Sequence, residues 1–363
     1  MNQTTPFDIT IIGAGPAGST LARLLGKYFR IALLDRRTFS ASQPLSLNKC
    51  CGGLLAPDAQ AMLARLGLGV PDEVLASPQL FSVRTIDLPS GLEQYYQRHY
   101  LNVDRERFDS WLLSLVPDTV TQIKDALFQT ALVEKELVKV QYAQQGKTKN
   151  IYTRYLIGAD GANSLVRKLI KSPLPGPEKY MAFQEWFPAT TPLPYFAALF
   201  DQTLTDFYGW LIPKNDKLIV GGAFRAENDS QQKFFQMKKK LLKFGFELKT
   251  PLYREGAWVE RPMKSDQICL GEGPILLIGE AAGWISPSSA EGFSYAMSSA
   301  LALAKAFRHS LDFVALQKQY HHHTRPLSKN IWIKNRKSPL MYRPSLRKFI
   351  LRSGLKGLKL EKI

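Results

Sequence analysis

Cysteine is scarce in this sequence, and long apolar runs are missing. The 363 residues include three cysteines, Cys50, Cys51 and Cys269. They are too few and too irregularly spaced for a disulfide framework or a zinc site. No apolar stretch reaches the length of about 18 residues that a membrane-spanning helix needs. The first residues have neither a basic region nor an apolar core, so we expect no secretory signal and a cytoplasmic protein.

The histidines give no indication of a metal site either. His321, His322 and His323 are consecutive, so on a helix they point in different directions. No acid or cysteine lies nearby to complete a set of ligands, and we expect no metal. His99 and His309 have no nucleophile motif around them, which leaves hydrolytic chemistry without support.

The composition is that of a globular protein with one unusually basic end. Hydrophobic residues make up 45% and charged residues 22%, which excludes disordered and fibrous classes. The net charge is +17, and residues 318–363 supply +12 of it, from 13 basic residues and one acid. The length favours two domains or one large one.

The basic end has the pattern of an amphipathic helix. Between residues 344 and 360, apolar residues alternate with lysine and arginine at helical spacing. Such a helix favours contact with an anionic membrane, at the inner face of the membrane in a cytoplasmic protein. A docked helix with a solvated basic face remains the alternative. Nucleic-acid binding is not expected, because no reading module or stacking platform accompanies the charge.

The opening of the chain has the pattern of a dinucleotide-binding unit. A short β-branched run is followed by Gly13, Gly15 and Gly18, then by a helical pattern and a second apolar run that ends in Asp35. In this pattern the first glycine permits a tight turn, the second lets the backbone approach a pyrophosphate, and the third packs the helix against the strand. The helix N-terminus attracts phosphate, and the acid accepts hydrogen bonds from a ribose.

A similar arrangement occurs near the other end. The buried-strand run 274–278 leads into Gly279-Glu280-Ala281-Ala282-Gly283 and then into a helix that begins near Gly292 and runs to about residue 306. Between these two units, residues 80–88 and 218–224 have strand patterns, and 230–246 has a helical one. No second GxGxxG unit is present, so we expect no separate NAD(P)H domain.

Several motifs together resemble one family. Tyr155 to Ser164 (YLIGADGANS) and Gly279 to Gly283 (GEAAG, usually GDAAG) resemble the second and third flavin motifs of flavoprotein hydroxylases. The start at Arg105 resembles the Arg-x-x-Phe-Asp helix of that family. The segment Lys49 to Leu54 (KCCGGL) and the segment Tyr208 to Lys214 (YGWLIPK) resemble motifs of geranylgeranyl reductases, closest to their bacterial CbrA-like branch.

The resemblance implies an α/β fold. It predicts a Rossmann-like FAD-binding domain of the glutathione-reductase-like, hydroxylase type, interleaved with an antiparallel β-sheet substrate domain and followed by a basic helical C-terminus. The expected boundaries are 1–80, 100–170 and 268–315 for the FAD-binding domain, 81–99 and 171–267 for the substrate domain, and 316–363 for the C-terminal region.

The resemblance also implies the residues of the site. Cys51 is the candidate catalytic residue at the flavin, although small buried cysteines are common and packing is an alternative role for Cys50 and Cys51. Tyr208, Trp210 and Pro213 are the candidate substrate residues, although aromatic residues in strands often belong to the core. The expected FAD-binding residues are Gly13, Gly15, Pro16, Ala17, Gly18, Asp35, Arg36, Cys51, Gly52, Arg105, Asp160, Gly161, Gly279, Glu280, Gly283, Pro287, Gly292 and Phe293.

The function implied is that of an FAD-dependent oxidoreductase. The leading hypothesis is the reduction of C=C bonds of an isoprenoid lipid by hydride transfer, with NAD(P)H or an electron-transfer protein as the electron donor. A monooxygenase that hydroxylates an apolar or aromatic substrate is the first alternative. A flavin-bound, lipid-binding regulatory protein with little turnover is the second.

Overall fold

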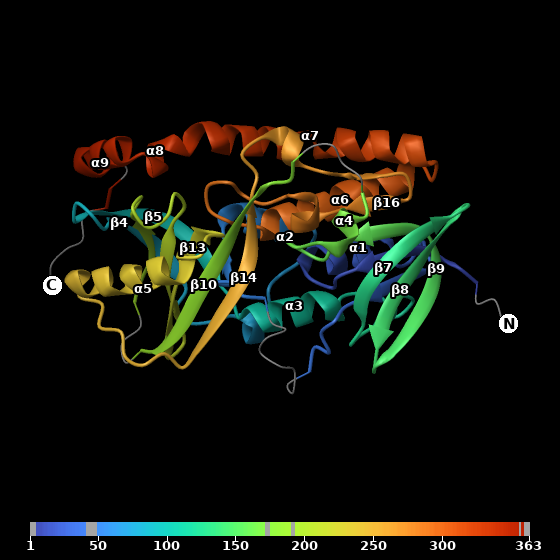
Figure 1. Ribbon diagram of the computed structural model, residues 1–363, viewed down its shortest axis with the longest axis horizontal. Helices are drawn as coiled ribbons and strands as arrows, with labels where there is room; N and C mark the ends of the chain where they lie inside the picture. The colour runs from blue at the N-terminus through green and yellow to red at the C-terminus, as the bar shows by residue number, and fades with distance from the viewer. Residues whose placement is uncertain (1–4, 41–48, 171–174, 190–192, 356, 359–363) are drawn as a thin grey trace. The chain divides into compact units, whose positions relative to one another are not determined.

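The computed structural model describes residues 5–40, 49–170, 175–189, 193–355 and 357–358 (Figure 1). The last residues of the predicted basic helix, 356 and 359–360, lie outside this description. The chain forms two compact units, and each consists of three segments. Unit 1 contains residues 1–48, 106–178 and 260–333, and unit 2 contains residues 49–105, 179–259 and 334–363.

Unit 1 is built on a mixed sheet in the strand order β15-β16-β9-β1-β2-β6. The five strands from β16 to β6 are parallel, and β7 and β8 continue from β9 as antiparallel strands. The elements of unit 1 are β1 (Phe7–Ile12), α1 (Pro16–Leu25), β2 (Ile31–Leu34), α3 (Arg105–Ser114), β6 (Thr121–Ile123), β7 (Leu127–Glu134), β8 (Leu137–Gln144), β9 (Lys147–Gly158), α4 (Leu165–Lys168), η4 (Ser265–Gln267), β15 (Gly271–Glu272), β16 (Ile275–Leu277), η5 (Gly279–Ala282), α6 (Phe293–His309) and α7 (Phe313–Lys337).

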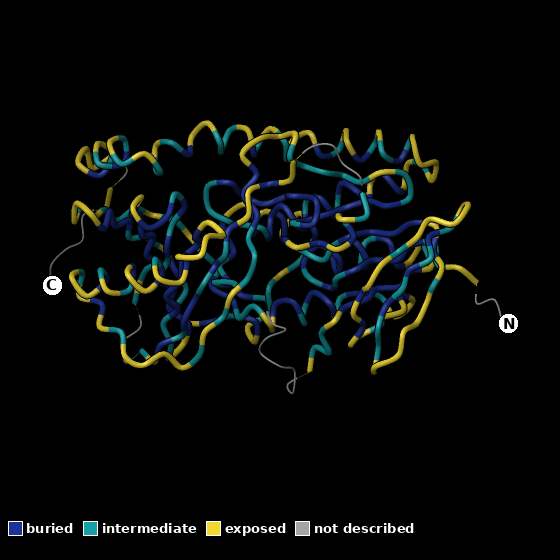
Figure 2. The backbone as a smooth tube through the Cα atoms, in the orientation of Figure 1, coloured by how far each residue is buried: buried dark blue, intermediate teal, exposed yellow. Residues whose placement is uncertain are grey.

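The central strands of unit 1 are buried on both faces. Ile9 and Ile11 of β1 pack into a cluster with α1 and α6, whereas Ile12 packs on the opposite face with residues of β2 and β8. Figure 2 shows these strands in the colour of buried residues, while the outer ends of β7 and β8 are exposed. Burial on both faces explains the continuous apolar runs by which β1, β2 and β16 are predicted from the sequence.

Unit 2 is built on a second sheet in the order β14-β10-β13-β12-β11-β4-β5-β3. The pairs with a recorded register are antiparallel except for β11 with β4, which is parallel. Its elements are β3 (Leu54–Leu55), α2 (Pro57–Arg65), η2 (Asp72–Val74), β4 (Leu80–Asp87), β5 (Leu92–Asn102), β10 (Glu178–Pro188), β11 (Phe196–Phe200), β12 (Gly209–Lys214), β13 (Lys217–Arg225), α5 (Ser230–Leu241), η3 (Leu242–Phe244), β14 (Tyr253–Arg261), α8 (Pro339–Tyr342) and α9 (Pro344–Ser353).

The two faces of the unit 2 sheet differ. One face packs against α5 through Phe234, Met237 and Leu241. The other carries a group of aromatic residues that we call the aromatic face. Its members are Tyr96, Tyr100, Trp186, Phe196, Phe200, Tyr208 and Trp210.

Most predicted elements are confirmed, but one segment lies in another unit than expected. β4, β13 and α5 with η3 match the predicted strands and helix. Residues 49–80 were expected with the FAD-binding domain and lie in unit 2. The reason is strand pairing, because Leu54 of β3 pairs with Asn102 at the end of β5 and so joins the segment to the second sheet.

Candidate functional site

The predicted FAD-binding residues of unit 1 follow the carboxyl ends of four adjacent parallel strands. Gly13 follows β1, Asp35 follows β2, Asp160 follows β9 and Gly279 follows β16. The register aligns these ends, because Ile12 pairs with both Leu34 and Gly158, and Leu277 also pairs with Gly158. Ligands of open α/β sheets bind outside the carboxyl ends of the strands. Unit 1 therefore gathers the three flavin motifs at one edge.

The glycines of the first motif have different surroundings. Gly13 has φ +104°, and a Cβ there would lie 2.5 Å from the carbonyl oxygen of Ala159. A Cβ on Gly18 would lie 1.8 Å from the carbonyl oxygen of Gly13, so α1 crosses the turn at close range. Gly15 has no atom within 4 Å of its missing Cβ. Gly15 is also the N-cap of α1, where no side chain caps the helix. The open space and the uncapped N–H groups fit a pyrophosphate.

Asp35 is held in a network that the sequence did not predict. Its carboxylate accepts hydrogen bonds from the backbone N–H of Ala14 at 2.7 Å and from the side chain of Arg37 at 3.0 Å. Arg37 also donates to Asp109 on α3 at 2.8 Å. Burial alone would lower the pKa of Arg37, but Asp109 and Asp35 together raise it. Arg36, which was predicted to bind FAD, is exposed.

Asp160 of the second motif forms the start of α4. Its carboxylate accepts hydrogen bonds from Ser164 Oγ at 2.6 Å and from the backbone N–H of Leu165 at 2.7 Å. Burial raises the pKa of Asp160 in spite of these hydrogen bonds. Gly161 has φ +81°, and its missing Cβ faces open space. The aspartate therefore shapes the turn, and the glycine leaves the backbone beside it accessible.

Glu280 of the third motif reaches the backbone of Glu260, which lies at the end of β14 and belongs to unit 1. Its Oε1 accepts a hydrogen bond from the N–H of Glu260 at 3.2 Å. Arg167, which donates to the carbonyl oxygen of Gln267 at 2.9 Å, lies 3.6 Å from the carboxylate of Glu260. Gly279 is fixed by its N–H, which donates to Ser299 Oγ at 2.9 Å. The longer glutamate side chain thus has a defined partner where the family usually has aspartate.

The first turn of α6 already contains a carboxylate. Glu291 accepts hydrogen bonds from the N–H of Ser294 at 2.7 Å and from its Oγ at 2.5 Å. Gly292 is the N-cap of α6, and the ring of Phe293 packs edge-on against Phe108 with centroids 5.2 Å apart. The N–H of Ser294, in the first turn of the helix, therefore already has an acceptor within the chain. Pro287 accepts a hydrogen bond from Arg261 at 2.9 Å.

The remaining predicted residues lie in unit 2. Cys51 is half-buried, and its Sγ accepts a hydrogen bond from the N–H of Gly53 at 3.4 Å. Cys50 is buried, and burial raises the pKa of its thiol. A Cβ on Gly52 would lie 2.2 Å from Ile212 Cδ1, so the end of the Ile212 side chain would have to move to admit a larger residue. Arg105 is half-buried; it is the last residue of this segment of unit 2 and the first residue of α3, whose other residues belong to unit 1.

Lys214 is the main residue of unit 2 that the predicted site omitted. Its side chain is buried, and Nζ donates to the carbonyl oxygens of Gly53 at 3.1 Å and Val103 at 2.5 Å and to Asn102 Oδ1 at 2.5 Å. Burial lowers the pKa of Lys214 to about 7, although Cys51 and Asp104 act in the opposite direction. Lys214 therefore ties the loop that follows Cys51 to the end of β5. The sequence feature that could have identified Lys214 is its position at the end of the Tyr208 to Lys214 motif.

The predicted substrate residues belong to β12 and the residue before it. Tyr208 and Trp210 lie on the aromatic face with ring centroids 5.7 Å apart, and both are half-buried. Pro213 is buried, and its carbonyl oxygen accepts a hydrogen bond from Asn102 at 2.9 Å. Tyr208 and Trp210 are thus only partly buried, whereas Pro213 is enclosed within the strand.

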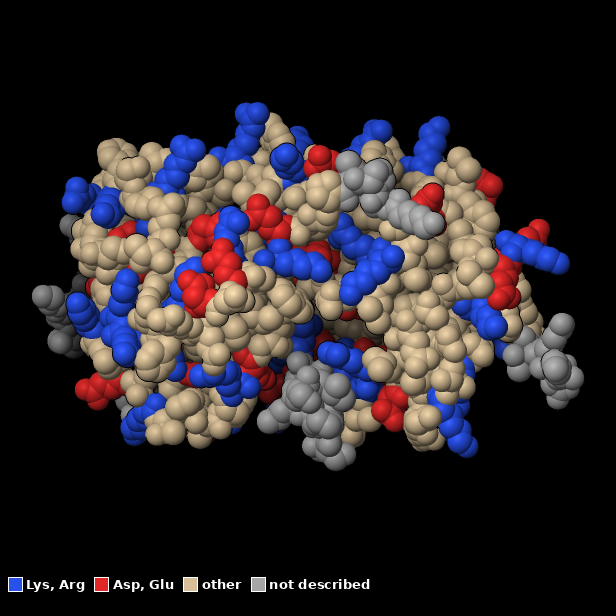
Figure 3. All heavy atoms as spheres, viewed as in Figure 1, with Lys and Arg blue, Asp and Glu red and all other residues tan. Residues whose placement is uncertain are grey.

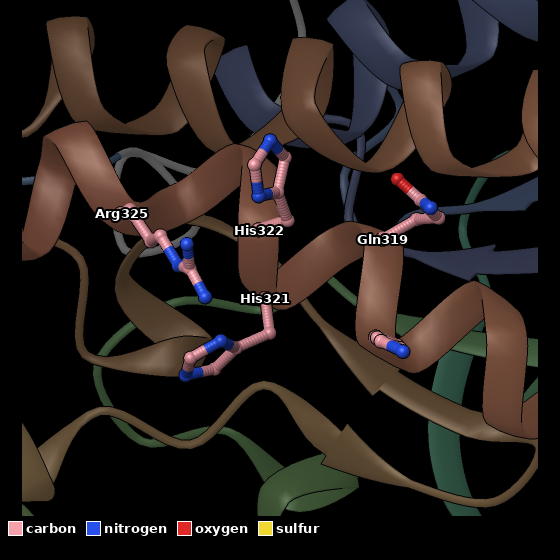
Figure 4. A pocket seen from close by; sticks show the side chains of 5 residues that line it. Gln319, His321, His322 and Arg325 are labelled. Carbon is pink, nitrogen blue, oxygen red and sulfur yellow. The ribbon is translucent and has the colours of Figure 1, made fainter.

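The consecutive histidines lie on α7. Figure 4 shows His321 and His322 projecting from the helix in different directions, with Arg325 and Gln319 nearby. They line a hollow of about 400 Å³ together with Lys318, and every residue that lines it comes from this helix. Within the described residues, no group of three or more histidine, cysteine, aspartate or glutamate side chains is placed to hold a metal ion.

Comparisons with known proteins agree with this geometry. A family model described as FAD binding domain matches residues 119–333. The chain is 40% identical over 349 residues to protein CbrA of Escherichia coli O157:H7, which covers 96% of this chain and 97% of that protein.

Solved structures share the fold at low sequence identity. A geranylgeranyl bacteriochlorophyll reductase-like protein from Thermoplasma acidophilum has a TM-score of 0.79 at 17% identity, over 94% of this chain and 90% of its own. The halogenase PltM, solved in complex with FAD, has a TM-score of 0.68 at 14% identity, over 92% of this chain and 76% of its own. With the family model and the CbrA relationship, the chain therefore contains an FAD-binding domain and belongs to the CbrA family.

Proposed function

We propose that this protein reduces C=C bonds of an isoprenoid lipid. The observation that supports the proposal is the aromatic face of unit 2, where five of the seven aromatic side chains are only partly buried, although Met341 and Tyr342 of α8 pack against the group. Aromatic and apolar walls with few polar groups are typical of sites for apolar ligands. Unit 1 supplies the cofactor-binding residues, and unit 2 supplies the surface for the lipid.

The chemistry requires a hydride and a proton. FAD, when bound and reduced, supplies the hydride to one alkene carbon. A proton goes to the other carbon, so the product gains two hydrogens, and NAD(P)H or an electron-transfer protein restores the reduced cofactor. We propose Cys51 as the proton-donating residue, because its thiol is half-buried and its loop is fixed by Lys214.

The decisive experiment follows the fate of the lipid. Purified protein with reduced FAD is mixed under anaerobic conditions with geranylgeraniol, and we expect the flavin absorbance to return while the lipid gains two mass units per reduced bond. The saturated alcohol serves as the control and should leave the flavin reduced. We expect Cys51→Ala to slow this step at least tenfold and Cys269→Ala to leave it unchanged.

Two results would overturn the proposal. Oxygen incorporated into the lipid when air is admitted, with no anaerobic reaction, would identify a monooxygenase. Lipid binding without either reaction would identify a lipid-binding protein with little turnover. A full anaerobic rate in Cys51→Ala would remove only Cys51 from the mechanism.

We also propose peripheral contact of α9 with an anionic membrane. Phe349 is 71% exposed and Leu355 is 66% exposed, and both lie beside basic residues in a stretch, 334–355, that contains no acid. Figure 3 shows Lys and Arg side chains projecting where α8 and α9 lie. Within the described residues, no helix is both long and apolar enough to span a membrane, so contact would be at the surface.

A further inference from the structure

One face of α7 carries a line of exposed residues that the proposed function does not use. We call this line the α7 stripe, and all of it belongs to unit 1. Its members are spaced alternately four and three residues apart. With 3.6 residues per turn and a rise of 1.5 Å per residue, they lie within about 80° around the helix and span about 21 Å. The exposed members are Lys318, His322, Arg325, Lys329 and Trp332.

The opposite face of α7 is buried, and this burial fixes the direction of the α7 stripe. Leu316, Tyr320, Thr324 and Ile331 are the buried residues of the helix. The hydroxyl of Tyr320 donates to the carbonyl oxygen of Leu277 at 2.8 Å. Because a rotation of α7 about its axis would break this hydrogen bond and expose these side chains, the stripe is held toward solvent.

The bases of the α7 stripe are not used within the fold. Arg347 of α9, by contrast, is buried and pairs with Asp87 at 2.6 Å. In the part of the chain that the structure describes, no carboxylate lies within ion-pair distance of Lys318, Arg325 or Lys329. The whole of α7 contains no aspartate or glutamate. The positive charge of the stripe is therefore available to an anionic partner.

One end of the α7 stripe borders the hollow of about 400 Å³ on this helix. Lys318, His321, His322 and Arg325 line it, and successive members three or four residues apart are neighbours on a helix surface. Figure 4 shows the side chain of Arg325 extending toward that of His321. Gln319 completes the lining, which contains no acid. Ammonium and guanidinium groups donate charge-assisted hydrogen bonds to phosphate, so this lining favours a phosphate group.

We propose that the α7 stripe lies on the anionic surface of a phospholipid bilayer, with a lipid phosphate in the hollow. A line of residues along one helix face reaches a flat surface with all its members, and each base near an anionic bilayer adds to the affinity. Trp332, at the far end, is 50% exposed and is of the type enriched at headgroup level. This inference deepens the membrane contact proposed for α9 but rests on no residue of α9, which belongs to unit 2.

The test is sedimentation of the full-length, FAD-loaded protein with vesicles of phosphatidylcholine that do or do not contain phosphatidylserine. Arg325→Gln combined with Lys329→Gln should weaken binding to the anionic vesicles about 30-fold, since each base contributes a factor of about five. The matched control, Lys147→Gln combined with Lys149→Gln, removes two exposed lysines of β9 in the same unit and should bind nearly as well as the wild type. Both double variants should unfold in urea like the wild type, because the changed side chains are exposed.

Four outcomes would overturn the inference. The first is equal weakening in both double variants, which would show a response to net charge alone. The second is normal binding of Arg325→Gln with Lys329→Gln, and loss of binding in Phe349→Glu would then leave the α9 contact standing. The third is release from vesicles by inorganic phosphate but not by sodium chloride of the same ionic strength, which would identify a site for small anions. The fourth is retention on single-stranded DNA without binding to anionic vesicles.

A second measurement tests the contact of Trp332 with the bilayer. Brominated phospholipids in the anionic vesicles quench the fluorescence of tryptophans that they contact, and we expect Trp332→Phe to lose most of this quenching. Trp111→Phe, which changes a half-buried tryptophan of α3, should keep it. Equal quenching in the wild type and Trp332→Phe would contradict the orientation of the α7 stripe. These measurements need no turnover, so a failure of the proposed lipid reduction would leave their result unchanged.

Discussion

Gly15 and Gly18 show how closely spaced glycines differ at the scale of single residues. The space beside Gly15 is open, and its φ of −76° suits any residue. A Cβ on Gly18 would meet the carbonyl oxygen of Gly13 at 1.8 Å. The space beside Gly15 is therefore suited to a ligand, whereas glycine at position 18 is required by the packing of α1 on the turn.

We expect Gly15→Ala to fold normally and to bind FAD at least tenfold more weakly, because the methyl group occupies the space left for the pyrophosphate. Gly18→Ala should be destabilised by roughly 1–3 kcal/mol or more, because the turn must move to relieve the overlap. FAD titration by fluorescence quenching and thermal unfolding of the apoprotein measure the two effects. Wild-type FAD affinity in Gly15→Ala would contradict this account of the first motif.

Lys214 gives a pH dependence whose sign follows from its burial. The pKa of its amine is about 7 in the folded protein and 10.5 in an exposed lysine. Between these values the unfolded chain binds the proton and the folded protein does not, so stability rises as the pH increases from 7 toward 10. Below pH 7 the Lys214 amine is charged in the folded protein, so the full cost of burying this charge lowers the stability.

We expect the free energy of unfolding of the wild type to increase between pH 7 and pH 9, relative to Lys214→Met, by about 2–3 kcal/mol. Urea unfolding of both proteins at several pH values measures the difference. As a control, Lys217→Met changes a half-buried lysine at the start of β13, in the same hairpin. This variant should show the same dependence of unfolding free energy on pH as the wild type. Parallel pH profiles for the wild type and Lys214→Met would show that Lys214 stays charged throughout this range.

The sequence predicts which residue types bind the cofactor better than it predicts their partners. Gly13, Gly15 and Asp35 are recognisable because a local strand, turn and helix pattern surrounds them. The pairing of Arg37 with Asp109, and the three acceptors of Lys214, depend on residues far apart in the chain. No spacing rule brings these together, so only the structure reveals them.

At the scale of elements, α9 differs from the helix expected on the membrane. Arg347 was part of the predicted basic face, yet it is buried and paired with Asp87 of β4 at 2.6 Å. Its guanidinium also lies 5.1 Å from the centre of the Phe200 ring. Arg347 therefore attaches α9 to the sheet, and the side of the helix with Phe349 remains exposed.

We expect the full-length protein to sediment with vesicles that contain phosphatidylserine and to be released at high salt. Phe349→Glu should lower the affinity at least tenfold, because it adds a negative charge and removes an apolar contact. Phe81→Glu, which changes an exposed phenylalanine of β4, serves as the matched control and should bind normally. Equal binding of the wild type and Phe349→Glu would show that α9 does not make the contact.

Strand order is the element-scale property that the sequence did not provide. Buried apolar runs in the sequence predict β1, β2 and β16. The order of strands in the largely antiparallel sheet of unit 2 is not predictable in this way, because its strands come from distant parts of the chain. Gln184 and Trp210, for example, lie on the same face only through that register, because each pairs with Gly221 of the strand between them. A shift of one residue in any pairing would turn these side chains to the other face.

At the scale of the whole molecule, charge is divided unevenly along the chain. Residues 318–363 carry +12 of the net charge of +17, but some of these bases are neutralised within the fold. Arg347 pairs with Asp87, and Lys334 lies 3.3 Å from Asp58. Part of the basic charge at this end therefore attaches the last helices to the rest of the fold.

The division of each unit into three chain segments has a consequence for biosynthesis. β16 lies beside β9 in the first sheet, yet it is made only after most of unit 2 has left the ribosome. A nascent chain that stops before residue 275 has the first two flavin motifs without the third. The sheet edge that carries all three motifs is therefore complete only after β16 and the segment that follows it have been synthesised.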